Sequence, residues 1–157
     1  MRRILVIALA IMLLASAGAF ARSSGFAIGG EGSVSYSGIG GLPVYAMLTL
    51  HFPRFPIYFG IGVDAAADIG FTADYWFAHG NLGSIFAYYV GIGGYLALAP
   101  NVPAFAGGAR LPLGLQLWPF GSVFEIFLEV APAVGVSFVP TGFDWHLQGA
   151  VGFRFWL

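Results

Sequence analysis

The feature that most constrains the fold is an alternation of apolar residues with polar or small residues, which recurs in eight segments of the chain. The segment 145–157 shows it most clearly. Its apolar residues would share one face: Trp145, Leu147, Gly149, Val151, Phe153, Phe155 and Leu157. The intervening residues include His146, Gln148 and Arg154. Because side chains alternate between the two faces of a β-strand, this period of two predicts strands.

The other seven segments cover about residues 25–36, 44–52, 57–66, 70–78, 85–98, 108–118 and 123–136. Gly- and Pro-rich sequences that favour turns separate them, among them 53–56, 79–83 and 119–122. Aliphatic and aromatic residues dominate one face of the segments, and charged residues fall on the other. Lipid outside and polar groups inside are typical of a transmembrane barrel. We therefore expect an all-β protein: an eight-stranded antiparallel transmembrane β-barrel with short turns and loops.

Two other architectures fit the sequence less well. Hydrophobic residues make up 59% of the chain and charged residues 8%, which favours a membrane protein. A helical membrane protein needs about 20 consecutive apolar residues per span, but the best run, 85–98, is shorter and holds glycines at 91, 93 and 94. A soluble lipid-binding barrel would carry its apolar residues inside, which reverses the observed pattern.

The first residues have the pattern of a secretory signal peptide. Arg2 and Arg3 precede the uncharged apolar run 4–14, and Ala19-Phe20-Ala21 fits an A-x-A cleavage site. We expect residues 1–21 to be removed and 22–157 to form the barrel, with Phe20 as the second choice for the mature start. A retained transmembrane helix is the alternative, but the apolar run is short for one. The expected destination is the outer membrane, reached by Sec-type export.

Composition argues against several classes of function. The chain has no Cys, so it forms no disulfide and carries no lipid-modified Cys. Its mature part has four scattered Arg residues and no Lys, unlike a nucleic-acid-binding surface. The three histidines would lie at opposite ends of the barrel, and we expect neither a metal nor a cofactor. A weak calcium site made by Asp64, Asp68 and Asp144 is the alternative.

Charged residues at inward positions predict a polar network in the lumen. If segments 108–118 and 123–136 pair through the turn 119–122, Gln116 lies opposite Glu125 and Pro112 opposite Glu129. Arg110 is then diagonal to Glu129. An eight-stranded barrel is just wide enough for side chains to fill it. We expect Arg110, Gln116, Glu125 and Glu129 to plug the lumen, with ion conduction as the alternative.

A second polar cluster is expected at the outer mouth, formed by Ser33, Ser35, Asp64, Asp144 and His146. An acid, an imidazole and a hydroxyl are the groups of a hydrolase triad. However, the sequence does not fix the register in which the first strand closes on the last, and polar residues at a wet mouth need no catalytic role. We expect no enzymatic activity, with a membrane-embedded lipid hydrolase or acyltransferase as an alternative.

Four stretches of the sequence resemble a known family: GIGGY (91–95), ARLPLGLQLWP (109–119), EIFLEVAPAVGV (125–136) and DWHLQGAVGFRFWL (144–157). The mature chain, and most closely its C-terminal half, resembles the small spirochaetal outer-membrane barrels, which are likened to the eight-stranded OmpA-type domain. The resemblance implies fold and location rather than activity. The aromatic C-terminus (Phe153, Phe155, Leu157) also resembles the signal read by barrel-assembly machineries, although Leu157 stands where Phe or Trp is usual.

These observations predict an integral outer-membrane protein with a structural or surface-exposed role and a packed polar lumen. A narrow pore gated by the lumen charge network is the alternative. The expected partners are outer-membrane lipid and, during biogenesis, the barrel-assembly machinery. We expect a monomer that binds no nucleic acid. The sequence does not name an extracellular ligand.

Overall fold

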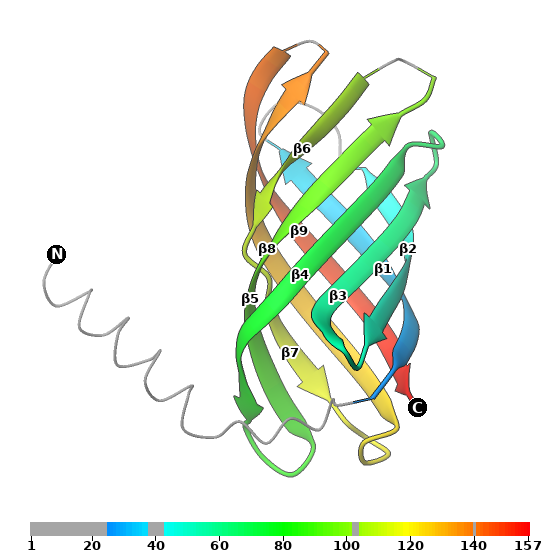
Figure 1. Cartoon of the computed structure of the whole chain (residues 1–157), viewed down its shortest axis with the longest axis vertical. Coiled ribbons are helices and arrows are strands. Elements are labelled where there is room, and N and C mark those ends of the chain that lie inside the picture. The colour runs from blue at the N-terminus through cyan, green and yellow to red at the C-terminus, as the bar shows by residue number, and fades with distance from the viewer. Residues whose placement is uncertain (1–24, 38–42, 102–103, 140) are drawn as a thin grey trace, which may run out of the picture.

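The computed structural model describes residues 25–37, 43–101, 104–139 and 141–157, which form a closed eight-stranded antiparallel β-barrel (Figure 1). Its strands are β1 (Ala27–Ser37), β2 (Val44–Phe52), β3 (Phe55–Asp64), β4 (Ile69–Asn81), β5 (Phe86–Ala99), β6 (Ala104–Arg110), β7 (Leu113–Leu117), β8 (Phe124–Phe138) and β9 (Thr141–Trp156). The expected signal peptide lies outside the described residues. Within those residues, no helix is long and apolar enough to cross a membrane.

The labels β6 and β7 denote two halves of one strand. Both halves pair with β5 on one side and β8 on the other, in the same register. Only Leu111 and Pro112 separate them, because proline has no N–H to donate to a ladder. Backbone bonds still span the break, from Leu111 N to Pro132 O and from Gly91 N to Pro112 O, at 3.0 and 2.8 Å. The prediction of eight strands is therefore confirmed, and the expected strand 108–118 is present, although it begins at Ala104, ends at Leu117 and is interrupted at Leu111 and Pro112.

Pairing of β1 with β9 closes the barrel. Ala27 lies opposite Trp156 at one end of this seam, and Ser37 lies opposite His146 at the other. We call the end that carries Ala27 and Trp156 the terminus end, which is the lower end in Figure 1, and the opposite end the far end. The short connections β2–β3, β4–β5 and β7–β8 lie at the terminus end. The sequence alone did not determine this register between the first and the last strand.

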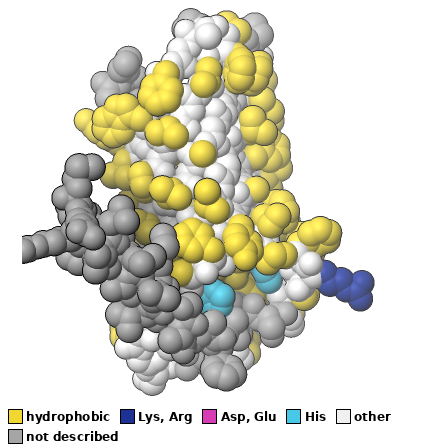
Figure 2. Space-filling view, turned by 60° about the vertical axis from the view of Figure 1, so that its left-hand side comes forward, with side chains coloured by type: hydrophobic (Ala, Val, Ile, Leu, Met, Phe, Trp, Pro, Cys, Tyr) yellow, Lys and Arg dark blue, Asp and Glu magenta, His cyan; other side chains and the backbone are white. Residues whose placement is uncertain are grey.

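The alternation expected from the sequence determines which side chains face out. Along β8, the exposed residues Ile126, Leu128 and Val130 alternate with the buried residues Glu125, Phe127 and Glu129. No Asp, Glu, Lys, Arg or His occupies an outward position in any described strand. Figure 2 shows hydrophobic side chains spread over the wall, and no acidic side chain is visible on that face. Apolar residues cover the outside, and the charges lie inside.

Several expected boundaries are wrong by a few residues. The expected turn 53–56 is limited to Pro53 and Arg54, since β3 begins at Phe55. The expected turn at 79–83 is strand as far as Asn81, because His79 and Gly80 continue to pair with β5 after an irregularity between Trp76 and Ala78. The last strand begins at 141 rather than 145. In each case strand pairing extends through residues that have turn-like composition.

Candidate functional site in the barrel lumen

The terminus half of the lumen is filled by aromatic rings. The Tyr58 and Trp76 rings stack with centroids 3.4 Å apart, Trp76 and Tyr89 stack at 3.8 Å, and His51 stacks on Tyr58 at 4.4 Å. Trp156 lies against His51 and against Trp118. We call these six residues the aromatic floor: His51, Tyr58, Trp76, Tyr89, Trp118 and Trp156. Five of them come from five different strands and Trp118 directly follows β7, so together they close the lumen at this end.

Glu125 stands beside the aromatic floor and is fully buried. Its Oε1 accepts hydrogen bonds from Gln116 Nε2 at 2.8 Å and Arg154 Nη1 at 2.9 Å, and its Oε2 accepts one from Trp156 Nε1 at 2.8 Å. The Arg154 guanidinium also lies over the Phe127 ring, 3.8 Å from its centroid. Three donors and one positive charge thus compensate for the desolvation of this carboxylate.

A second ionic group lies nearer the far end. Arg110 Nη2 pairs closely with Glu129 Oε1, Arg110 Nη1 donates to Gln148 Oε1 at 2.6 Å, and Arg110 Nε lies 3.1 Å from Asp74 Oδ1. The other oxygen of Glu129 accepts a hydrogen bond from the Tyr89 hydroxyl at 2.6 Å. One guanidinium therefore serves two carboxylates and an amide, and the group connects to the aromatic floor through Tyr89.

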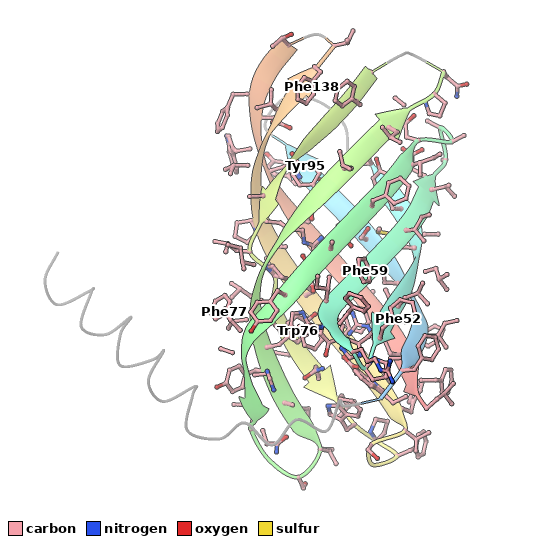
Figure 3. All side chains as sticks on the ribbon, viewed as in Figure 1. Phe52, Phe59, Trp76, Phe77, Tyr95 and Phe138 are labelled. Atoms are coloured by element: carbon pink, nitrogen blue, oxygen red, sulfur yellow. The ribbon has the colours of Figure 1, made fainter. Side chains whose placement is uncertain are left out.

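The Arg110–Glu129 pair separates two cavities along the barrel axis. The inner chamber, about 10 Å³ in volume, is lined by Glu31, Thr49, Asp74 and Arg154 together with rings of the floor. It has room for about one water molecule. The larger cavity, about 190 Å³ in volume, lies on the far-end side, and we call it the vestibule. Arg110 and Glu129 line both cavities. In Figure 3, Tyr95 of the vestibule lies well above Trp76 of the floor.

A chain of hydrogen-bonding groups leads from Arg110 to the vestibule mouth. Arg110 has only donors, so the Gln148 oxygen faces it and the Gln148 Nε2 points to His146 Nε2, 2.8 Å away. That ring nitrogen must then be the acceptor. The proton of a neutral His146 is consequently on Nδ1, which lies 3.6 Å from Asp144 Oδ2. The tautomer of His146 thus follows from the contacts of Gln148.

These residues do not assemble a hydrolase triad. In a triad, one ring nitrogen faces the acid and the other faces the nucleophile. Here the second nitrogen of His146 contacts Gln148, and the Ser33 hydroxyl points to Met47 Sδ at 3.4 Å. Ser35 lies on β1 directly opposite Gln148. In the described part of the chain, no group of three or more His, Asp or Glu side chains is arranged to hold a metal ion.

The structure places the four residues of the expected lumen network inside the barrel, but as two groups. Gln116 contacts Glu125, whereas Arg110 contacts Glu129. The expected register is wrong by two residues: Gln116 lies opposite Phe127, and Gly114 lies opposite Glu129. The reason is the position of the turn: the last pair of β7 with β8 joins Leu117 to Ile126, so the loop between paired residues covers 118–125 and is centred one residue later in the chain than the turn 119–122. A shift of two keeps every side chain on its expected face.

The expected cluster at the outer mouth is only partly assembled. Ser33, Ser35, Asp144 and His146 all line the vestibule. Asp64 does not. It belongs to the β3–β4 turn, where its Oδ1 accepts hydrogen bonds from the backbone N–H groups of Ala66 and Asp68 at 2.8 and 2.9 Å. Asp64 therefore stabilises a turn, as Asp residues commonly do.

Sequence reasoning did not connect Asp74, Gln148, Arg154 or Trp156 to the ionic groups. Their inward positions follow from the alternation, since each stands on the polar face of its segment. Their partners do not, because Asp74 reaches Arg110 from β4, and Arg154 reaches Glu125 across the β8–β9 pair. A full set of registers around the barrel would have been required to predict these contacts.

The residues of the expected assembly signal lie on the outer wall at the terminus end. Phe153 and Phe155 are exposed, and their rings join those of Phe124 and Phe120 in an aromatic surface cluster. Leu157 follows the end of β9, and its N–H donates to Phe26 O at 2.8 Å. Comparison with protein-family models, with curated proteins and with solved structures found no match for this chain.

Proposed function

We propose that the protein is an integral outer-membrane β-barrel with a sealed lumen and a structural or surface-exposed role. The observation that carries the proposal is the distribution of side chains between the two faces of the wall. Large apolar residues stand exposed on every strand, whereas Glu125, Arg110 and Arg154 are buried inside. In water, such an outer surface would be an extreme apolar patch. In lipid, it is the surface expected of a membrane-spanning barrel.

Two barriers in series support a sealed lumen. The aromatic floor closes the terminus end, and the Arg110–Glu129 pair separates the vestibule from the inner chamber. Both barriers are fixed by contacts from several strands, so opening either one requires breaking stacked rings or a buried ion pair. A packed polar interior of this kind favours a rigid membrane anchor over a channel.

The last strand supports a proposal about biogenesis. Phe153 and Phe155 point outward from β9, where a factor outside the barrel could contact them. We propose that the barrel-assembly machinery reads this aromatic edge before β9 closes on β1. An even number of strands brings the two chain termini to one side of the membrane. The terminus end would then face the periplasm and the far end the exterior.

The membrane assignment is tested by folding residues 22–157 from denaturant. The folded barrel should require detergent or lipid to stay in solution, and unheated samples should migrate on gels differently from boiled ones. Protein refolded into lipid vesicles should resist extraction at alkaline pH. A monodisperse, folded protein in plain buffer, with no affinity for vesicles, would rule out the proposal.

A narrow pore is the second candidate, and the two cavities on the barrel axis are the observation that favours it. A path from the vestibule through the inner chamber is interrupted mainly by Arg110 and Glu129. Three acids (Glu31, Asp74 and Glu129) and two arginines (Arg110 and Arg154) line the inner chamber, and this excess of negative charge would favour cations. In planar bilayers we expect no conductance above background. A steady cation-selective current from the unmodified protein would favour the pore over the sealed barrel.

A further inference from the structure

The vestibule is the one large feature of the described lumen that a sealed barrel does not need. Its volume of about 190 Å³ is more than ten times the 10–15 Å³ that a single water molecule requires. It is smaller than the usual pocket for a drug-sized ligand, about 300–1,000 Å³. The cavity therefore has room for a small molecule of a few heavy atoms and its water, but not for a peptide loop.

The charges on the vestibule wall favour a cation. Arg110, Glu129 and Asp144 line it, so its formal charge is negative. The positive charge of Arg110 is already shared by two carboxylates, Glu129 and Asp74, and its Nη1 donates to Gln148. An anion would therefore find no free positive partner. Both oxygens of Glu129 are likewise engaged, by Arg110 and by the Tyr89 hydroxyl.

Asp144 is the remaining carboxylate on the wall. Its side chain is 43% exposed, and the ion pair that it forms among the described residues is with His146, at 3.6 Å. The contact between Gln148 and His146 Nε2 makes that histidine neutral, with its Nδ1–H toward Asp144. A neutral imidazole does not neutralise the charge of the Asp144 carboxylate.

The rest of the wall suits the non-polar part of a small amine. The Tyr95 ring packs edge-on against the His146 ring, with centroids 4.7 Å apart, and the side chains of Met47, Ala97 and Ala150 add apolar surface. An aromatic ring beside a carboxylate is a favourable setting for an ammonium group, which gains both charge pairing and contact with the ring face. The hydroxyls of Ser35 and Thr72 add hydrogen-bond acceptors.

We propose that the vestibule binds a small organic cation carrying a primary ammonium group, with Asp144 as its counter-ion and Tyr95 against its carbon chain. Asp64 and Asp68 stand at the same end of the barrel, so the approach to the mouth is also negative. The ammonium could belong to a free amine or to an ethanolamine lipid headgroup. The phosphate of a headgroup would meet a wall that has no free cation, so the free amine is the expected ligand.

The test uses residues 22–157 folded in a maltoside detergent and phosphate buffer, which contain no amine. Binding of n-butylammonium is measured by calorimetry and by saturation-transfer NMR, with n-butanol and butyrate as the neutral and anionic counterparts. We expect saturable binding of the ammonium alone. Folding is verified by gel mobility in every sample. Failure of n-butylammonium to bind would overturn the proposal, and since no membrane is present it would leave the membrane assignment untouched.

Matched variants locate the site. Asp144→Asn should weaken the affinity by about tenfold or more, as expected for the loss of a hydrogen-bonded charge. Tyr95→Leu should weaken it by about threefold. Asp68→Asn, a change of the same charge at the same end but off the cavity wall, should change it by less than about twofold.

Two further results would overturn the proposal: equal affinities for butanol and butylammonium, or an Asp144→Asn variant that binds as tightly as the parent. Glycerophosphoethanolamine and free ethanolamine separate the two sources of the ammonium group. Tighter binding of ethanolamine is expected and assigns a free amine. Tighter binding of the phosphodiester assigns the lipid headgroup.

Discussion

At the scale of single residues, the stability of the packed lumen depends on buried carboxylates that are surrounded by hydrogen-bond donors. Glu125 accepts from Gln116, Arg154 and Trp156 and has no exposed surface. A glutamine in its place would point its NH₂ group at another donor and would leave Arg154 buried without a negative partner. Glu125→Gln should therefore lower the free energy of unfolding by about 3 kcal/mol or more.

That loss is measured by urea unfolding of the barrel in vesicles, followed by tryptophan fluorescence. Asp68→Asn is the matched control, because Asp68 stands in the β3–β4 connection, away from both ionic groups. It should change the unfolding free energy by less than about 0.5 kcal/mol. Equal effects at the two positions would contradict the conclusion that the hydrogen bonds accepted by Glu125 stabilise the barrel.

The Arg110–Glu129 pair should behave as one unit. Glu129→Gln strands a buried guanidinium, and Arg110→Met strands Glu129 and Asp74. Each single change should destabilise the barrel, and the double variant should lose less than the sum of the two, with a coupling of about 1–3 kcal/mol. The same urea titration measures all four proteins. Strict additivity would mean that the two side chains do not interact in the folded barrel.

At the scale of strands, glycines on the inner and outer faces of the wall differ in how much room there is for a side chain. A Cβ on Gly114 would collide with the Tyr89 ring, which stacks on Trp76 and donates to Glu129. A Cβ on Gly32, on the outer face of β1, would meet nothing within 4 Å. Gly114→Ala should therefore cost about 1–3 kcal/mol of stability.

Gly32→Ala should be neutral or slightly stabilising, since alanine restricts the unfolded chain more than glycine does. Thermal or urea unfolding of the two variants, each against the parent, makes the comparison. If Gly32→Ala were as costly as Gly114→Ala, the assignment of inner and outer faces on these strands would be wrong.

Strands also show how far the sequence could predict this structure. The in-or-out direction of Glu125, Glu129 and Arg154 follows from alternation, which survives changes in strand length. Register does not, because it depends on where each turn is centred, and the loop between the last paired residues of β7 and β8 is centred one residue later than its Pro and Gly residues suggest. The contact between Arg154 and Glu125 was therefore missed although both inward positions were correct.

At the scale of the whole molecule, the wall should tolerate charge on one face only. Leu115, Leu128, Val151 and Gly32 form one row across β7, β8, β9 and β1 near the middle of the barrel. Leu128→Arg would place a cation at that height on the outside and should cost about 2–4 kcal/mol in lipid. Ser35→Arg, at a position that lines the vestibule as Asp144 does, should cost less.

Refolding into vesicles of defined thickness, followed by urea titration, measures both variants. The cost of Leu128→Arg should also fall when the protein is placed in detergent micelles, where the wall is less uniformly apolar. If the two variants lost the same stability in vesicles, the outer wall would not be in contact with lipid.

The seam between β1 and β9 has a consequence for the order of folding. Every other pairing joins strands that are neighbours in the sequence, but Ala27 and Trp156 are more than a hundred residues apart. Hairpins such as β8–β9 are local and can form early. Forming the β1–β9 pair costs more conformational entropy, because it closes a loop of nearly the whole barrel. The rate of barrel formation should therefore be governed by this single meeting of first and last strand. Destabilising substitutions in the β1–β9 pair should therefore slow folding. Substitutions within a hairpin that cost the same stability should mainly speed unfolding.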